Sequence, residues 1–194
     1  MFTRWLSRQW VKLALVLGTL LLLLLPILSY RLEWNSFLIL VYLQTPIYML
    51  HQVEEHTRDR FRTFLNQQIY HGVEALTPVA VLWINIPGVW GITFVSLYMA
   101  VFVAAGWGLI GAYLTAVNAV VHLAWGIGMR KYNPGLWTAI LLFVPLSVLT
   151  FWKSAGTQAT WANHLVGLAV AMGIHAAIVI YTGRRAGHLR ALHS

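Results

Sequence analysis

Long apolar segments dominate this chain and restrict its fold more than any other feature of the sequence. Four segments have about the length of a membrane-crossing helix: 13–28, 37–56, 136–152 and 161–181. Residues 73–129 are apolar almost throughout. A helix needs about 20 predominantly apolar residues to cross the hydrocarbon core of a bilayer. Only 9% of the residues are charged, against about a quarter in soluble domains. The sequence therefore predicts an all-α polytopic transmembrane helical bundle, organised as a single domain over residues 1–194.

The apolar block at 73–129 forms either two or three spans, and the basic residues decide between them. We expect two, the first kinked at Pro87 and the second starting near Leu109, which gives about six spans with both termini cytoplasmic. Eleven basic residues then lie inside: Arg4, Arg8, Lys12, Arg58, Arg60, Arg62, Arg130, Lys131, Arg184, Arg185 and Arg190. Arg31 and Lys153 lie outside, as the positive-inside rule favours. Residues 57–70 are polar and are expected to form a loop or an interfacial helix.

Composition excludes several classes of function. The chain has no cysteine, which excludes disulfides, thiolate metal sites and cysteine nucleophiles. The net charge of +8 is accounted for by basic residues at the ends of spans, so we expect no nucleic-acid partner. The nucleophile elbow, the Walker A loop and the H-E-x-x-H signature are all absent from the sequence. The expected partner is the lipid bilayer, and a homo-oligomer is compatible with the sequence.

The acidic residues carry most of the functional signal because they are so rare. The chain contains five: Glu33, Glu54, Glu55, Asp59 and Glu74. On a helix, His51, Glu54 and Glu55 occupy positions i, i+3 and i+4, so their side chains project from one face. Adjacent carboxylates near lipid lose hydration and repel one another, and they need a cation, a base or a proton. We expect a metal ion to satisfy that requirement.

Further polar residues are expected at the same depth in the bilayer. His51, His122 and His175 precede the first basic residue at the cytoplasmic end of their segments by seven, eight and nine residues. At ~1.5 Å per residue, they lie roughly 10 to 14 Å inward from those basic residues. Asn118 lies one turn from His122 and is expected to orient it. Glu74 is expected at the cytoplasmic end of the third span, at nearly the same depth as the three histidines.

These observations give a candidate site. The expected metal ligands are His51, Glu54, Glu55 and His122, with His175 as a secondary ligand. The expected catalytic carboxylates are Glu54, Glu55 and Glu74. A ligand set of nitrogen and oxygen alone suits iron, zinc or manganese, and residue types do not choose among these metals. The depth of the site favours a lipid-like or apolar small molecule as the substrate.

Each assignment has a simpler alternative. Arg58 and Arg62 follow the acidic pair closely enough to neutralise it in an interfacial ion cluster. His122 alternatively hydrogen-bonds only to Asn118 or to a carbonyl group, and His175 lies in a run of small residues where histidines often serve packing.

The function therefore has three open interpretations. The leading one is a membrane-embedded metal-dependent hydrolase or oxidoreductase with a site that opens toward the cytoplasm. A proton-coupled transporter would use the same carboxylates and histidines as a relay, and would need a polar path to the outer side, for which the sequence offers Gln44, Thr45, Asn85 and Thr93. A non-catalytic membrane subunit is the third interpretation.

His56, next to the acidic pair, is expected in solvent.

The sequence also resembles a known family at these residues. His51-Gln52-Val53-Glu54-Glu55 is similar to the motif of the HXXEE family of small bacterial integral membrane proteins. The later segments Asn118–His122 and Arg130–Gly135, with Thr138, resemble the family's second histidine helix and its Tyr-x-Pro-Gly-x-x-Thr turn. The Arg-rich stretch after the motif departs from the family pattern. The resemblance implies a multi-pass protein of the bacterial inner membrane, for which an enzymatic role has been supposed from the motif.

Overall fold

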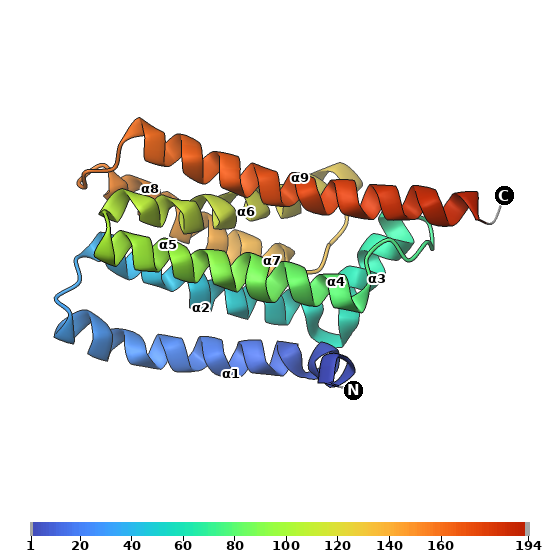
Figure 1. The fold of residues 1–194 in the computed structure, drawn as a ribbon, viewed down its shortest axis with the longest axis horizontal. Coiled ribbons are helices and arrows are strands. Elements are labelled where there is room, and N and C mark those ends of the chain that lie inside the picture. The colour runs from blue at the N-terminus through green and yellow to red at the C-terminus, as the bar shows by residue number, and fades with distance from the viewer. Residues whose placement is uncertain (1, 193–194) are drawn as a thin grey trace.

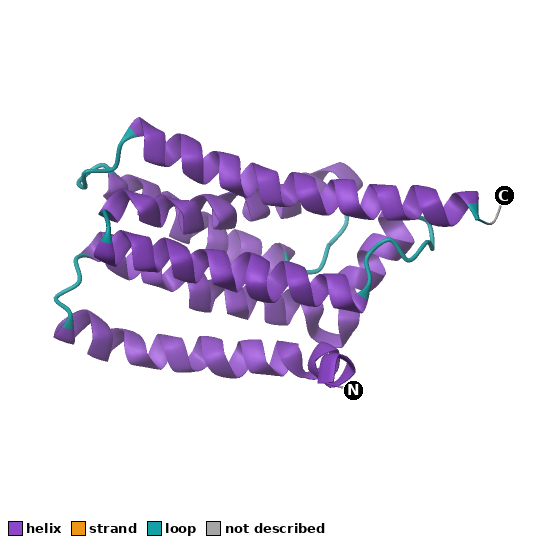
Figure 2. Ribbon diagram, in the orientation of Figure 1, coloured by secondary structure: helices purple, strands orange, loops and turns teal. Residues whose placement is uncertain are grey.

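The computed structural model describes residues 2–192, which form a bundle of helices with no strand in that range (Figure 1; Figure 2). The side chains of Arg4 and Arg8 lie outside the described part. The elements are α1 (Phe2–Arg31), α2 (Ser36–His56), η1 (Thr57–Asp59), α3 (Arg60–Phe64), η2 (Leu65–Ile69), α4 (Pro78–Trp83), η3 (Ile84–Trp90), α5 (Gly91–Phe102), η4 (Ala105–Gly108), α6 (Leu109–Met129), α7 (Leu136–Thr138), η5 (Ala139–Phe143), α8 (Val144–Ser154) and α9 (Trp161–Ala191).

Five helical segments are long and apolar enough to cross a membrane. They are Gln9–Arg31, Pro78–Phe102, Ala105–Met129, Leu136–Ser154 and Trp161–Ala191. This finding is consistent with an integral membrane protein. The helix α2 is also long, at 21 residues, but it carries many polar side chains and packs against α1, α5, α6 and α8 inside the bundle. Its crossing of the membrane as a sixth span stays a prediction.

The two-helix interpretation of the block at 73–129 is confirmed. Residues Pro78–Phe102 form one helical segment, which contains Pro87 within the π-helical stretch η3, and a second segment starts at Ala105. The wider π-helical turn accommodates the proline without ending the segment, because proline removes one backbone donor and displaces the preceding carbonyl. The polar stretch after α2 is helical in part, as η1, α3 and η2.

The starts of three long segments follow from local sequence. Asn35 accepts a hydrogen bond from the backbone amide of Leu38 at the start of α2. Thr77 caps α4, with Pro78 at the first helical position, and Thr160 forms a capping box with Asn163 at the start of α9. Such side chains satisfy amide groups that the helix itself leaves free.

The start of α1 and the end of α9 lie at the same end of the bundle, together with the turns after α2 and α6 (Figure 1). Arg31 and Lys153, at the ends of α1 and α8, mark the opposite end. This arrangement places most of the basic residues at one end, as the charge pattern predicts. The assignment of that end to the cytoplasm stays a prediction.

The central helices α2 and α6 approach one another closely. A Cβ atom added at Gly108, where α6 begins, would lie 2.4 Å from Cγ2 of Val41 in α2. Any larger residue at position 108 would push the helices apart, as expected for close packing of membrane helices through small residues.

Candidate metal centre

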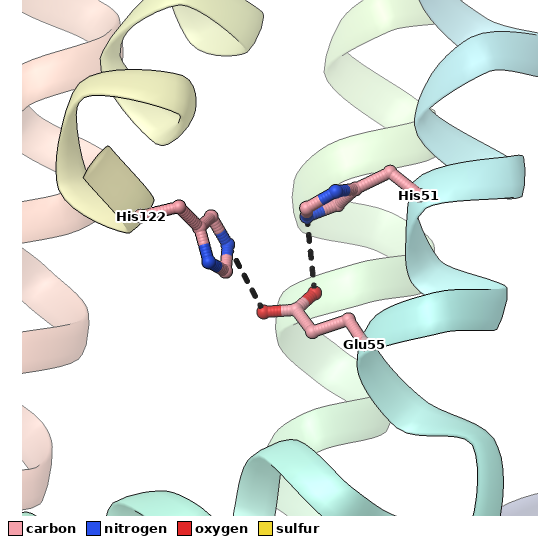
Figure 3. Close-up of side chains that lie close together, drawn as sticks. All are labelled: His51, Glu55 and His122. Carbon is pink, nitrogen blue, oxygen red and sulfur yellow. Dashed lines mark ion pairs between the residues drawn. The ribbon is translucent and has the colours of Figure 1, made fainter. Parts of the chain in front are cut away.

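Three side chains from two helices converge on one buried point. His51 and Glu55 project from α2, one turn apart, and His122 projects from α6 toward them (Figure 3). Nε2 of His51 lies 3.6 Å from Oε2 of Glu55, and Nε2 of His122 lies 3.6 Å from Oε1 of the same carboxylate. The exposed fractions are 0% for His51, 5% for Glu55 and 2% for His122, so water does not solvate this carboxylate freely.

A hydrogen-bond chain assigns the tautomer of His51. The hydroxyl of Thr138 lies 2.6 Å from Oε2 of Glu54 and 2.8 Å from Nδ1 of His51. Because a hydroxyl has one proton, and the charged carboxylate is the stronger acceptor, Thr138 donates to Glu54 and accepts from Nδ1–H of His51. Nε2 of His51 therefore carries a lone pair, and this buried atom has no hydrogen-bond partner.

His122 is held in the same tautomer by a different residue. The side-chain amide of Asn133 donates to the carbonyl oxygen of His122 over 3.0 Å, which fixes the orientation of the Asn133 side chain. Its oxygen, Oδ1, then lies 2.6 Å from Nδ1 of His122 and accepts the proton of that nitrogen. Nε2 of His122 is left with a lone pair that faces Glu55.

The group therefore brings two nitrogen lone pairs and one carboxylate together. The 3.6 Å separations are too long for hydrogen bonds. Ligand atoms about 2.0 to 2.2 Å from a tetrahedral metal ion lie about 3.3 to 3.6 Å apart, and each imidazole nitrogen lies at the upper end of that range from a different oxygen of Glu55. One ligand atom from each of the three residues lies within 4.8 Å of the others. His51, Glu55 and His122 can thus hold a metal ion, with each imidazole supported through its other nitrogen, as in known metal sites.

The turn between α6 and α7 supplies most of this support. Tyr132 donates its hydroxyl proton to Oε1 of Glu54 over 2.7 Å, and the backbone amide of Thr138 donates to Oε2 over 2.7 Å. Burial, followed by the hydrogen bond and the charge of Glu54, raises the pKa of Tyr132 to about 12. Glu54 therefore fixes the turn and does not point at the His51–Glu55–His122 group.

Gly135 fits this turn for two reasons. Its φ of +99° lies in the left-handed region that favours glycine. A Cβ atom there would also lie 2.7 Å from Cε1 of both His51 and His122. The backbone of the turn thus covers the two imidazoles directly.

The sequence predicts the turn but not its role. Tyr132 and Glu54 are 78 residues apart, and Thr138 and Glu54 are 84 apart, so no local pattern reveals that they bond. The signal available in the sequence is a cluster of tyrosine, asparagine and threonine hydrogen-bonding groups just after the His122 helix. The family motif that the sequence resembles includes residues of this turn, but it does not indicate which side chains they bond to.

The expected role of Asn118 falls to Asn133. Asn118 lies on the wall of the cavity beside the site, and its buried Oδ1 atom has no hydrogen-bond partner. His175 lines the same cavity, and its Nδ1–H donates to the carbonyl of Ala171 over 2.8 Å. The structure therefore places His175 beside the three-residue group and not within it.

Glu74 lies outside this group. Its carboxylate is exposed and forms an ion pair of 2.8 Å with Arg62, which also pairs with Asp59. The hydrogen bond to Asp59, partly offset by burial and reinforced by both negative charges, raises the pKa of Arg62. Arg62 thus neutralises Asp59 and Glu74 and not the acidic pair of α2.

Histidines replace arginine as the partners of Glu55. In the described part of the chain, the basic side chains within 4.0 Å of its carboxylate are those of His51, His56 and His122. His56 is buried, contrary to the expectation that it lies in solvent, and its Nε2 lies 3.1 Å from Oε2 of Glu55. The expected ion cluster with Arg58 and Arg62 is therefore not formed at Glu55.

A cavity of about 310 Å³ adjoins the group. Glu55 and His122 form part of its wall, and aliphatic and aromatic side chains form most of the rest. The volume lies near the lower limit for sites that bind small molecules, about 300 to 1,000 Å³. The site thus combines a charged, ligand-rich wall with an apolar chamber.

Comparison with known proteins assigns the chain to a family. No curated protein and no solved structure matches it. A family model described as "Protein of unknown function with HXXEE motif" matches residues 42–150, more than half of the 194-residue chain. The matched region contains the three converging residues and the turn that supports them. The chain belongs to the HXXEE family.

Proposed function

We propose that the protein is a membrane-embedded metal-dependent enzyme, a hydrolase or an oxidoreductase, that acts on a lipid-like or apolar small molecule. The observation that carries this proposal is the pair of imidazole lone pairs directed at one buried carboxylate with no proton between them. Three acceptors in a site of low dielectric repel one another, and a divalent cation removes that repulsion.

The number of ligands favours catalysis over a purely structural role. Structural zinc sites usually have four protein ligands, whereas catalytic sites have three and keep a position open. A set of two histidines and one carboxylate also occurs in non-haem iron oxygenases. A metal ion at this position would act as a Lewis acid toward a substrate or water at its open position.

The residues around the metal position have distinct proposed roles. His51, Glu55 and His122 bind the metal, while Thr138 and Asn133 hold the two imidazoles in the ligating tautomer. His175 donates its Nδ1 proton to a backbone carbonyl, so Nε2 is free to accept a proton within the cavity. The apolar walls exclude bulk water and favour an apolar substrate.

The polar residues of the other half of the bundle do not support transport. Gln44 donates to Thr150 over 3.0 Å, and Thr45 donates to Thr93 over 2.9 Å. These hydrogen bonds join neighbouring helices within the bundle, as polar residues commonly do in membranes. Asn85 lines the cavity beside Glu55, but Gln44, Thr45 and Thr93 do not, so these four residues do not continue one polar path from the cavity to the other end of the bundle.

Metal binding provides the first test. The full chain, purified in detergent, is loaded separately with zinc, ferrous iron and manganese, and bound metal is measured after desalting. We expect about one ion per chain, lost in Glu55→Gln and in His122→Ala. Glu33→Gln, a change of an acidic residue at the opposite end, should keep the metal. Circular dichroism confirms that each variant remains helical.

The outcomes separate the parts of the proposal. A wild-type chain without bound metal, or metal retained in both site variants, would overturn it. With metal bound, metal-dependent turnover of a long-chain chromogenic ester supports the hydrolase branch. Metal-dependent oxygen uptake with a long-chain substrate supports the oxidoreductase branch. Bound metal with neither activity would leave a metal-binding protein without the proposed catalysis.

A further inference from the structure

The cavity beside the candidate metal centre is closed toward the end of the bundle that carries the C-terminal part of α9. The hydroxyl groups of Tyr70 and Thr182 lie 2.7 Å apart and join the segment before α4 to α9. Arg185 and Arg190 of α9 donate to the carbonyl oxygens of Glu74 and Tyr70, over 3.0 and 3.2 Å. These contacts fasten α9 over this end, so a ligand does not enter directly from that side.

Three other sides of the cavity are also closed. Stacked rings of Phe61 and Trp125, with centroids 6.1 Å apart, cover the side between α3 and α6. At the inner end, Leu114 and Val89 are buried, with exposed fractions of 0% and 4%. The helices α6 and α9 pack along their length and close a further side.

The remaining side lies between the α4–η3 segment and α9. Val81 and Ile84 form the wall on one side, and Ile178 and Val179 form it on the other. Val179 lines the cavity although 64% of its surface is exposed, so the cavity reaches the surface of the bundle at this residue. These four lining side chains are aliphatic, and both segments are among those able to cross a membrane.

The size and polarity of the cavity limit what occupies it. A volume of about 310 Å³ is near the lower end of small-molecule sites, which suits one hydrocarbon chain better than a two-chain lipid. The carboxylate and imidazoles lie on one wall, and a metal bound there would attract a polar or anionic group. An apolar chain would fill the space along Ile174 and Leu114.

We infer that the substrate is a single-chain amphiphile that enters sideways from the bilayer, between α4–η3 and α9, with its polar end at the metal centre. This inference rests on the proposed function, since the metal position defines the reacting end. The wall formed by α9 lies beyond residue 150, where the family match ends. Ile174, Ile178 and Val179 of α9 therefore contribute to selectivity for the chain from outside the matched region, while Val81, Ile84 and Leu114 contribute from within it.

The test uses a long-chain fatty acid with a photoactivatable group at the end of its chain. The full-length protein in proteoliposomes is irradiated with the probe, and the labelled residues are identified by mass spectrometry. We expect labelling of Leu114 or Ile174 inside the cavity. Val179→Trp should reduce it about tenfold, equivalent to ~1.4 kcal/mol of binding free energy.

Matched variants separate access from general effects on the helix. Met172→Trp places the same ring on α9 at a position that is 54% exposed and outside the cavity wall, and should leave labelling unchanged. Ile174→Trp fills the cavity from within and should abolish the labelling of Leu114. If Val179→Trp does not fold, Ile174→Trp still tests whether the probe occupies the cavity.

Two results would overturn the inference. One is labelling confined to outward-facing residues such as Met172. The other is labelling of the cavity at the wild-type level in both Val179→Trp and Ile174→Trp. The proposed function fails separately. Metal bound by His51, Glu55 and His122 without labelling of the cavity would refute sideways entry alone. Cavity labelling in a chain that binds no metal would refute the metal-dependent enzyme and leave a site for a single-chain amphiphile.

Discussion

Asn133 holds His122 through two hydrogen bonds: one from its amide to the backbone carbonyl and one from Nδ1–H of the ring to Oδ1. The first bond orients the amide, and the oriented amide determines which nitrogen of His122 carries the proton. A residue in a turn thereby determines that Nε2 is available as a ligand for a metal beside Glu55. The binding property of the histidine depends on a residue 11 positions away.

Removing this support should weaken metal binding. For Asn133→Ala we expect a loss of about 10- to 100-fold in metal affinity, the usual effect of removing the partner of a ligating histidine. Competition with a chromogenic chelator measures the affinity. Asn118→Ala changes an asparagine that lines the cavity but is not bonded to His122, and should stay within a few-fold of wild type. An equal loss in both variants would contradict the role of Asn133.

The hydroxyl of Thr138 should matter more than its shape. Thr138→Val keeps the volume but removes the group that links Glu54 to His51, so His51 loses the acceptor for its Nδ1 proton. We expect about a 10- to 100-fold loss of metal affinity. Thr138→Ser restores the hydroxyl and should recover most of the affinity. A serine variant as weak as the valine variant would show that packing, and not the hydrogen bond, is responsible.

Gly135→Ala should damage both the turn and the centre. The new Cβ would lie 2.7 Å from both imidazole rings, in a backbone conformation with φ of +99°. We expect a loss of stability of more than about 1 kcal/mol and reduced metal binding, measured by thermal unfolding and bound-metal analysis. The control is Gly128→Ala in α6, where nothing lies within 4 Å of the added atom. It should be neutral or stabilising by up to about 1 kcal/mol.

Tyr132 should titrate later than an ordinary tyrosine. Its pKa is raised from 10.0 to about 12, first by burial and then by Glu54. The folded state keeps this proton at a pH where the unfolded state has lost it. Its stabilising effect is therefore complete below pH 10 and is lost as pH rises toward 12. The difference in tyrosinate absorbance between wild type and Tyr132→Phe should have its midpoint near 12. A midpoint near 10 would contradict the bond to Glu54.

Several features of the fold follow from local rules in the sequence. The segment at 37–56 agrees closely with α2 (Ser36–His56), because apolar residues and the asparagine cap at position 35 define its limits. The Pro87 segment stays continuous, as the distribution of Arg130 and Lys131 predicts. The spacing of His51 and Glu55 on one face of a helix is likewise a local property.

The division of roles between the two adjacent glutamates does not follow from the sequence. Glu54 and Glu55 differ by one position, which is about 100° around a helix. Glu55 turns toward His122, whereas Glu54 turns toward the segment that carries Tyr132 and Thr138. Which neighbour each carboxylate meets depends on how α2, α6 and α7 pack, and helical periodicity gives no information about that packing.

The sequence by itself determined the helical class, the apolar segments and the small set of ionisable residues from which a site can be built. It did so because hydrocarbon requires long apolar helices and makes every charge within them costly. Only the tertiary structure decided that His51, Glu55 and His122 meet, that Glu74 lies apart, and that Asn133 and Thr138 fix the two imidazoles. Those contacts join residues far apart in the chain, and their free energy depends on helix packing that no local spacing encodes.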